Sequence, residues 1–235
     1  LLPMESSNIR VGNFTISCHS VNTLVIGSGA AALNAALSLH RMGQEDICIA
    51  TSQWGGGTSR NAGSDKQTYY KLSLCGSEPD SVAMMAADLF AGHCMHGDIA
   101  LCEAQGSVQA FMNLVSLGVR FPHDAFGSWA GYKTDHDPRA RATSAGPYTS
   151  KMMFEALSGE VGKRGIRIFD RHHCIALLTG GEEKVIGALA INTAEEDWTK
   201  AFVLFNSTNI ILGTGGPSGM FESSVYPISQ EGSTG

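Results

Sequence analysis

The sequence lacks the features of several broad classes of protein. No apolar run approaches the roughly 18 residues that a membrane-spanning helix needs, and the first residues lack the basic segment and long apolar core of a signal peptide. The net charge of −6 gives no indication of nucleic-acid binding. Charged residues make up 16% of the chain and hydrophobic residues 43%, a balance typical of a globular, core-forming protein.

The cysteines also lack a pattern, because none of the six forms a C-x-x-C pair. Scattered thiols indicate a reduced, intracellular protein whose cysteines are mostly buried, so we expect a cytoplasmic location. His93, Cys94 and His96 lie close together, but no second cluster completes a usual ligand set. We therefore expect no metal site.

Glycine is abundant, with 28 residues, and its most informative occurrence follows a short apolar run. Gly27, Gly29 and Ala32 fit the G-x-G-x-x-[G/A] pattern of dinucleotide-binding turns. The first glycine allows a tight turn, the second lets a pyrophosphate approach the backbone, and the third small residue lets helix and strand pack closely. The helix that follows offers free N–H groups to phosphate.

The context of this pattern strengthens it. We predict a strand over residues 22–27, a helix over residues 30–42 that Gly43 ends, and a second strand over residues 46–50. Together they make the β-α-β unit of about 30 residues that the pattern requires. The sequence thus predicts a dinucleotide site, in preference to a glycine-rich turn between core elements.

Two further glycine-rich turns follow. Residues 55–64 read Gly-Gly-Gly-Thr-Ser-Arg-Asn-Ala-Gly-Ser, and we favour a ligand-cradling loop over a flexible linker because glycine permits close backbone approach. An apolar strand over residues 210–212 runs into Gly-Thr-Gly-Gly at residues 213–216. We expect the three turns, all at strand ends, to converge on one extended ligand.

The rest of the chain completes an α/β pattern. An edge strand is expected over residues 14–19, two helices within residues 79–120 and one helix over residues 150–164. Residues 121–150 are irregular, and their ionisable stretch at residues 133–141 is either functional or a solvated surface loop. Short strands are then expected at residues 166–169, 174–178, 185–191 and 201–205, which end in a small antiparallel β-meander.

These motifs, in this order, resemble the flavoprotein family of fumarate reductase, succinate dehydrogenase and L-aspartate oxidase. The first turn resembles the family's FAD pyrophosphate turn, residues 55–64 its second FAD loop, and residues 174–205 the β-insertion of its FAD domain. Residues 213–216 resemble its Ala-Thr-Gly-Gly segment, and residues 230–235 the start of its Thr-Gly-Asp-Gly segment. The resemblance implies a Rossmann-like α/β FAD-binding domain with a central parallel sheet, flanking helices and the meander.

The resemblance also implies site residues. The pyrophosphate turn comprises Gly27, Gly29, Ala30, Ala31 and Ala32. The second loop, with Gly56, Gly57, Thr58, Ser59, Ala62 and Gly63, would line the ribityl chain and isoalloxazine. The backbone near Cys174 or Ile175 would meet the adenine, and Thr214, Gly215 and Gly216 would flank the cofactor again.

Two departures from the family pattern matter. The family commonly has Glu at the end of the second strand, where this chain has Thr51, so we expect the ribose contacts to be shared by Thr51, Ser52 or Gln53. Succinate dehydrogenases attach FAD through a His just before the Thr of the second loop. This chain has Gly57 there, so we expect non-covalent FAD.

In the family that the chain resembles, further residues bind the substrate, and no motif in residues 1–235 matches them. We expect residues 1–235 to be one FAD-binding domain, incomplete, without the capping domain and C-terminal FAD segment that carry the family's substrate residues. His136, Arg139 and Arg141 are candidates by chemistry alone, because a cation suits a carboxylate substrate. The electron donor or acceptor is not specified by the sequence.

The leading hypothesis is the FAD-binding part of an oxidoreductase that acts on CH–CH bonds of a small carboxylate, with hydride transfer through flavin N5. One alternative is an NAD-dependent dehydrogenase, which would leave the second loop and the meander unused and would expect an acidic residue after the second strand. Another alternative is a non-catalytic FAD-binding or electron-transfer subunit.

Overall fold

A computed structural model of the chain describes residues 5–62, 67–76, 78–134, 137–181, 184–216, 221–223 and 225–227. The contacts divide the chain into two compact units. Unit 1 comprises Leu1–Ala62 and Leu157–Gly235, and unit 2 comprises Gly63–Ala156. The prediction of a single incomplete FAD-binding domain stays a prediction.

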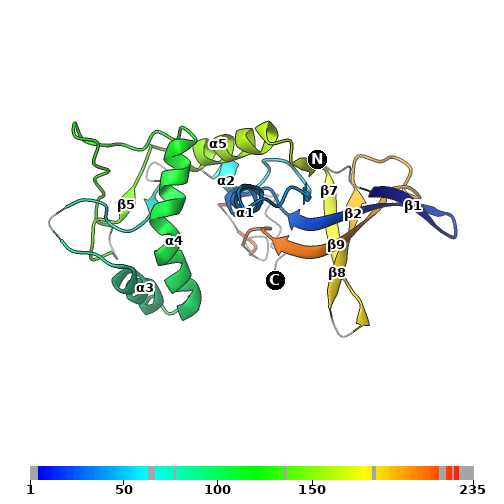
Figure 1. Cartoon of the computed structure of the whole chain (residues 1–235), viewed down its shortest axis with the longest axis horizontal. Coiled ribbons are helices and arrows are strands. Elements are labelled where there is room, and N and C mark those ends of the chain that lie inside the picture. The colour runs from blue at the N-terminus through cyan, green and yellow to red at the C-terminus, as the bar shows by residue number, and fades with distance from the viewer. Residues whose placement is uncertain are drawn as a thin grey trace. The chain divides into compact units, whose positions relative to one another are not determined.

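Unit 1 is built on one seven-stranded sheet (Figure 1) with the order β6-β3-β2-β9-β8-β7, and β1 pairs with β2. The strands β6, β3, β2 and β9 are parallel, whereas β8 and β7 continue the sheet in antiparallel fashion. The mixed α/β fold with a mostly parallel central sheet is therefore confirmed. The strands are β1 (Glu5–Val11), β2 (Phe14–Ile26), β3 (Ile47–Ala50), β6 (Arg167–Phe169), β7 (His172–Thr179), β8 (Val185–Asn192) and β9 (Phe202–Leu212).

Two strands are longer than the sequence indicates. The predicted edge strand at residues 14–19 and the first central strand form one strand, β2. Likewise, the meander strand at residues 201–205 and the central strand at residues 210–212 are both parts of β9. Polar residues such as Asn206 and Ser207 interrupt the apolar pattern but not the hydrogen-bonded ladder, because β9 pairs with β2 through this region. The meander is thus the antiparallel end of the main sheet.

The strand predicted at residues 166–169 has a different place from the meander. As β6 it pairs in parallel with β3, at the opposite edge of the sheet from β7. Thr51 at the end of β3 donates its N–H to the Phe169 carbonyl oxygen and accepts one from the His172 N–H through its own carbonyl. The turn between β6 and β7 therefore wraps around the end of β3.

The sheet curls around its core. The rings of Phe169 in β6 and Phe205 in β9 meet edge to face at 5.0 Å between centroids, although two strands separate β6 from β9. Alternate residues of β2, β3, β8 and β9 face this core because side chains in a strand point to opposite faces in turn. The core cluster contains Val21, Leu24, Ile26, Cys48, Ala50, Ala188, Ala190, Val203 and Phe205.

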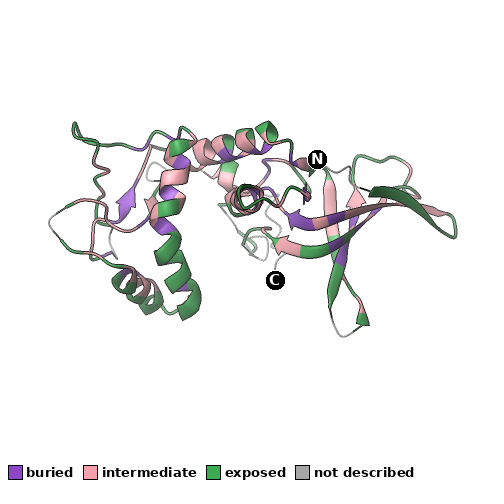
Figure 2. Cartoon of the chain, in the orientation of Figure 1, coloured by how far each residue is buried: buried purple, intermediate pink, exposed green. Residues whose placement is uncertain are grey.

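The helix α1 (Ala30–Arg41) packs against β2, β3 and β9. Leu33 and Leu37, one helical turn apart, are buried, and Gly43 with a φ of +92° follows the helix end. Figure 2 shows that burial in β2 is concentrated at its carboxyl end, whereas β1 is exposed throughout. The best-packed part of unit 1 is therefore the part where β2 meets α1.

Unit 2 holds two helices, α3 (Val82–Ala91) and α4 (Gly97–Ser116), which pack on each other, and a two-stranded ladder of β4 (Tyr69–Tyr70) and β5 (Ala142–Thr143). The predicted helices within residues 79–120 are confirmed. The division between the units falls inside α5 (Thr149–Lys163), close to the predicted helix at residues 150–164. Short α2 (Thr58–Asn61) belongs to unit 1.

No helix among the described residues is long and apolar enough to cross a membrane. The cysteines differ from the expectation of mostly buried thiols. All six are free, but only Cys48 is buried, and Cys94 and Cys102 are exposed. Cys94 lies in the turn between α3 and α4 and Cys102 on the exposed surface of α4, which the apolar pattern alone did not separate from core.

Candidate functional site

A cavity in unit 1 lies where β2, β3 and β9 end. The three glycine-rich turns that the sequence singled out all border it, together with the start of β7. The three turns thus meet at one cavity, and their contact with one extended ligand stays a prediction. The cavity is lined by Ile26, Gly27, Ser28, Gly29, Ala50, Thr51, Ser52, Gln53, Gly56, Gly57, Thr58, Ser59, His172, His173, Cys174, Gly213, Thr214 and Gly215.

The first turn depends on the absence of side chains. Gly27 has a φ of +109°, and a Cβ atom there would lie 2.3 Å from the Gly213 carbonyl oxygen. A Cβ atom on Gly213 would in turn lie 2.7 Å from the Ala32 Cβ. The third small residue of the pattern therefore packs helix α1 against the end of β9. Ala32 itself is fully buried and does not line the cavity.

The second loop is held by side chains of unit 1. Asn61 donates its side-chain N–H groups to the carbonyl oxygens of Gly55 at 2.7 Å and Gly57 at 3.1 Å. Asp170, in the turn after β6, accepts the Trp54 N–H at 2.7 Å. These bonds hold the backbone of the described part of the loop, residues 55–62, in one shape; its role in cradling a ligand stays a prediction.

Hydroxyl groups stand at the end of β3. The Ser28 Oγ and Thr51 Oγ1 atoms are hydrogen-bonded at 3.0 Å, and both residues are buried. Each also contacts the Gln53 carbonyl oxygen at 3.4 Å. A neutral hydroxyl pair thus occupies the strand end at which the resemblance leads one to expect a carboxylate.

Two buried hydroxyls border the cavity without a partner among the described residues. They are the Oγ1 atoms of Thr58, at the start of α2, and Thr214, after β9. A buried polar group without a hydrogen bond costs roughly 1–3 kcal/mol. Because both belong to cavity residues, a bound ligand with hydrogen-bonding groups would remove that cost.

The described lining of the cavity has no strongly acidic or basic side chain. Among the described residues that line it, none is Asp, Glu, Lys or Arg. Burial raises the pKa of the Cys174 thiol to about 11, so this thiol is neutral at physiological pH. Negative charge in a ligand would be met by backbone N–H groups and the positive end of the α1 dipole.

Twelve of the residues predicted for the cofactor site line the cavity. They are Gly27, Gly29, Thr51, Ser52, Gln53, Gly56, Gly57, Thr58, Ser59, Cys174, Thr214 and Gly215. Ala30, Ala31, Ala32, Ala62, Ile175 and Gly216 do not line it, and Gly63 lies outside the described residues, as do residues 230–235. The cofactor role of each residue stays a prediction.

Sequence reasoning missed His172 and His173, which line the cavity at the start of β7. The strand was predicted to begin at residue 174, two residues too late. It also passed over Ser28, the variable position of the G-x-G pattern. The hydroxyl of Thr51, the residue predicted to contact the ribose, could have drawn attention to Ser28 as a hydrogen-bond partner. The two residues are 23 positions apart, however, and only the fold brings them into contact.

The histidine and cysteine group near α4 serves a local purpose. His96 is the N-cap of α4, and its Nδ1 atom accepts the Asp98 N–H at 3.3 Å. Cys94 is exposed. Within the described part of the chain, no group of three or more His, Cys, Asp or Glu residues could hold a metal ion.

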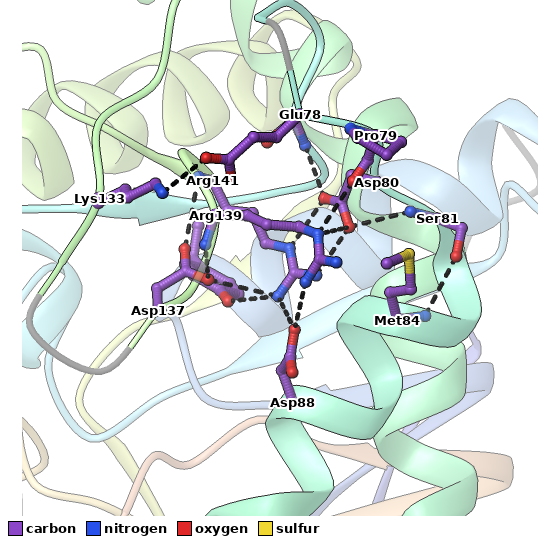
Figure 3. Close-up of polar contacts among 12 residues, drawn as sticks. Glu78, Pro79, Asp80, Ser81, Met84, Asp88, Lys133, Asp137, Arg139 and Arg141 are labelled. Carbon is purple, nitrogen blue, oxygen red and sulfur yellow. Dashed lines mark hydrogen bonds and ion pairs between the residues drawn. The ribbon is translucent and has the colours of Figure 1, made fainter.

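The substrate candidates lie in unit 2, apart from His136, which is outside the described residues. Figure 3 shows Arg141 inside a cluster of carboxylates. Its guanidinium bonds both oxygens of Asp80, at 2.8 and 2.7 Å, and donates to Asp88 at 2.8 Å. A weaker contact to Asp137 measures 3.4 Å. Arg141 is fully buried.

The charges of this cluster support one another. Burial by itself would raise the pKa of Asp80, but hydrogen bonds from Arg141 and from the N–H groups of Ser73 and Ser81 hold it below its ordinary value of 3.8. Arg139 is more open, and it donates to the Pro79 carbonyl oxygen at 3.0 Å. Its ion pairs with the carboxylates give Arg141 a structural role, and its side chain has no surface exposed to solvent. A role in substrate binding stays a prediction for Arg139 and Arg141.

The arrangement in unit 1 defines a class of protein. Parallel strands end on glycine turns around a cavity at a helix N-terminus, which is the construction of a dinucleotide-binding α/β domain. The chain belongs to the FAD binding domain family, whose profile matches residues 22–234. FAD is therefore its cofactor, and the unpartnered hydroxyls and charge-free backbone cradle fit that group.

Known proteins agree with this assignment. L-aspartate oxidase from Mycobacterium leprae is 28% identical over 221 residues, which cover 92% of this chain and 39% of that protein. The mitochondrial succinate dehydrogenase flavoprotein subunit from Oryza sativa subsp. japonica is 24% identical over 212 residues, 87% of this chain and 33% of that protein. The chain spans about two fifths of the curated relatives it matches first, at 39–40% of their length.

Among solved structures, quinol-fumarate reductase with menaquinol molecules superposes with a TM-score of 0.77 at 17% identity. The match covers 92% of this chain and 37% of that chain. At this identity the likeness shows a shared fold. The fold class expected from the sequence is confirmed by it.

We predict that Arg141→Met destabilises unit 2 by about 3–5 kcal/mol, because it leaves buried carboxylates without their counter-ion. Arg139→Met, the matched control, should cost less than about 1.5 kcal/mol because its side chain is partly exposed. Urea unfolding at pH 7 measures the free energy of unfolding of both variants.

The pairing of Asp80 with Arg141 stabilises the fold above pH 3.8, and this stabilisation is lost as the pH falls through the lowered pKa of Asp80. The loss of stability caused by Arg141→Met should therefore become smaller below about pH 4. Equal costs for the two variants would contradict this assignment.

We also predict that Thr58→Val and Thr214→Val each lower FAD affinity about 5- to 10-fold without lowering the stability of the apoprotein, because neither hydroxyl has a partner to lose among the described residues. Thr143→Val is the control, since its buried hydroxyl is likewise unpartnered among the described residues but belongs to unit 2. It should leave FAD affinity unchanged. Quenching of flavin fluorescence on titration of the apoprotein measures affinity. Similar effects from all three variants would contradict a role of the cavity hydroxyls in binding.

Proposed function

We propose that the chain is the FAD-binding part of a flavin-dependent oxidoreductase that acts on CH–CH bonds of a small carboxylate. The observation that carries the proposal is the cavity itself, where three glycine turns meet beside two buried hydroxyls that have no partner among the described residues. Relatives named L-aspartate oxidase and succinate dehydrogenase flavoprotein support the reaction class.

In this proposal, different groups of residues bind different parts of FAD. The turn at Gly27 and Gly29, with Ala30 and the N–H groups of Ala31 and Ala32 at the start of α1, holds the pyrophosphate, while the Ala30 N–H is donated to the Ser59 Oγ. Backbone at Cys174, with Ile175 beyond it, meets the adenine, and the hydroxyls of Ser28 and Thr51 take the ribose. The second loop, with Thr58, Ala62 and Gly63, lines the flavin side, and Thr214, Gly215 and Gly216 flank the cofactor after β9.

Bound FAD would supply a hydride acceptor or donor at flavin N5. The residues of this chain bind and orient it, and the buried strand ends exclude water from its diphosphate. A capping domain and a C-terminal segment, as in the family that the sequence resembles, would supply the substrate-binding groups. His136 and Arg139 are the candidates on this chain, whereas Arg141, the third candidate by its chemistry, is fully buried among carboxylates. We place the protein in the cytoplasm, which the six free thiols suit.

The proposed FAD is non-covalent. Gly57 stands before Thr58 in the second loop, where succinate dehydrogenases have the His that attaches FAD, and glycine has no side chain that could form this bond. We predict that acid precipitation of the holoprotein releases all flavin into the supernatant. Yellow colour that stays with the pellet after washing would contradict the prediction. A covalent succinate dehydrogenase flavoprotein treated in parallel is the control.

The oxidoreductase proposal is tested with the protein isolated from its native source. We predict that its flavin, reduced anaerobically with dithionite, is re-oxidised rapidly by fumarate and not by NAD⁺, as followed by the return of flavin absorbance in the blue. Chloride or acetate at equal concentration serves as the control. Residues 1–235 alone should react slowly, because the substrate groups lie elsewhere in the proposal. A flavin that no unsaturated carboxylate re-oxidises would favour a non-catalytic electron-transfer subunit instead.

A further inference from the structure

A hydrogen bond joins the two glycine-rich loops of the cavity. The Ser59 Oγ atom, from the second loop, accepts the N–H of Ala30, the first residue of α1, at 2.9 Å. Gly29, the N-cap of α1, provides no side-chain cap of its own. Ser59 therefore caps α1 from a segment 29 residues away.

The second glycine of the G-x-G pattern makes room for this contact. A Cβ atom on Gly29 would lie 3.2 Å from the Ser59 Oγ, closer than nearly all real Cβ contacts. In this chain the absence of a side chain at Gly29 thus leaves room for the Ser59 hydroxyl as well as for a ligand. The two loops are matched to each other at the helix N-terminus.

The bonding capacity of the serine is only half used. A hydroxyl has one proton to donate and lone pairs to accept with. The Ser59 oxygen accepts from Ala30, and among the described residues no acceptor receives its proton. Both Ser59 and Gly29 line the cavity, so this proton is available to a ligand oxygen there.

We propose that Ser59 is a positioning residue for the cofactor pyrophosphate: it accepts the first N–H of α1 and donates its own proton to a phosphate oxygen. This inference rests on the proposed placement of the pyrophosphate at the first turn. It gives Ser59 a place different from the ribityl and isoalloxazine side that the sequence resemblance implied. The serine transmits the positive end of the helix dipole to the anion through a polarised hydroxyl.

A purely structural cap and a pyrophosphate contact respond differently to aspartate. A carboxylate is a good helix cap, and it interacts favourably with the helix dipole. It has no proton to donate, however, and it repels a diphosphate. Ser59→Asp should therefore separate capping from binding, whereas Ser59→Ala removes both functions and Ser59→Thr keeps both.

The experiment measures the melting temperature of the apoprotein and FAD affinity for each variant. Ser59→Ala should lower the melting temperature by about 2–4 °C and FAD affinity by about 5- to 10-fold. Ser59→Asp should keep or raise the melting temperature and lower affinity by about 100-fold, with partial recovery at high salt. Ser59→Thr should match the wild type in both measurements.

Ser81 supplies the matched control, because it caps α3 in unit 2 through its Oγ atom, which accepts the Met84 N–H at 3.2 Å. Ser81→Ala should lower the melting temperature, Ser81→Asp should preserve it, and neither should change FAD affinity. An affinity loss from Ser81→Asp as large as that from Ser59→Asp would overturn the inference, since a general charge effect would then explain both.

Two other results would also overturn it. Ser59→Asp with unchanged FAD affinity would remove the serine from the pyrophosphate site. Melting temperature and affinity that fall together in Ser59→Asp would make Ser59 a structural residue only. A wild-type apoprotein that binds no FAD would refute the proposed function itself, a failure distinct from that of Ser59.

Discussion

The closest packing in the cavity is between the end of β9 and the turn that leads into α1. At Gly27 and Gly213 a Cβ atom would overlap the opposing segment, and at Ala32 only a methyl group fits. This contact places the carboxyl ends of β2 and β9 side by side and aims the α1 N-terminus at the space above them. The positions of the cavity, of the α1 N-terminus and of Thr214 all depend on this close packing of the end of β9 against the turn before α1.

Much of this arrangement could be predicted from the sequence, because short-range signals encode it. The G-x-G-x-x-A pattern, the helix that ends before Gly43 and the short β3 depend on local conformational preferences and periodicity. The three glycine turns could be predicted as ligand loops because glycine at a strand end permits close approach of the backbone to a ligand. The resemblance then joined them into one FAD site.

The failures have a different physical origin. β2 and β9 were each divided because polar residues within them satisfy the ladder through backbone groups, which a side-chain pattern does not report. The contact of Ser28 with Thr51, and of Ser59 with Ala30, joins residues that are far apart in the sequence. Arg141 was named as a substrate candidate by its charge alone, and its burial among Asp80, Asp88 and Asp137 could not be predicted because it depends on tertiary packing. Long-range partners decide such roles.

The length of β9 has a consequence for how the cofactor site forms during folding. β9 pairs with β2 from Val203 to Leu212, and nearly 200 residues of chain separate the partners, as in the pair Ile26 and Leu212. Pairs so far apart in sequence form late, because the entropy of closing so long a loop opposes them. During synthesis, the nucleotide turn emerges first but stays open until β9 has been made. The first glycine turn therefore gains its neighbouring strand only after β9 has been made, and cofactor binding can report that β2 and β9 have paired.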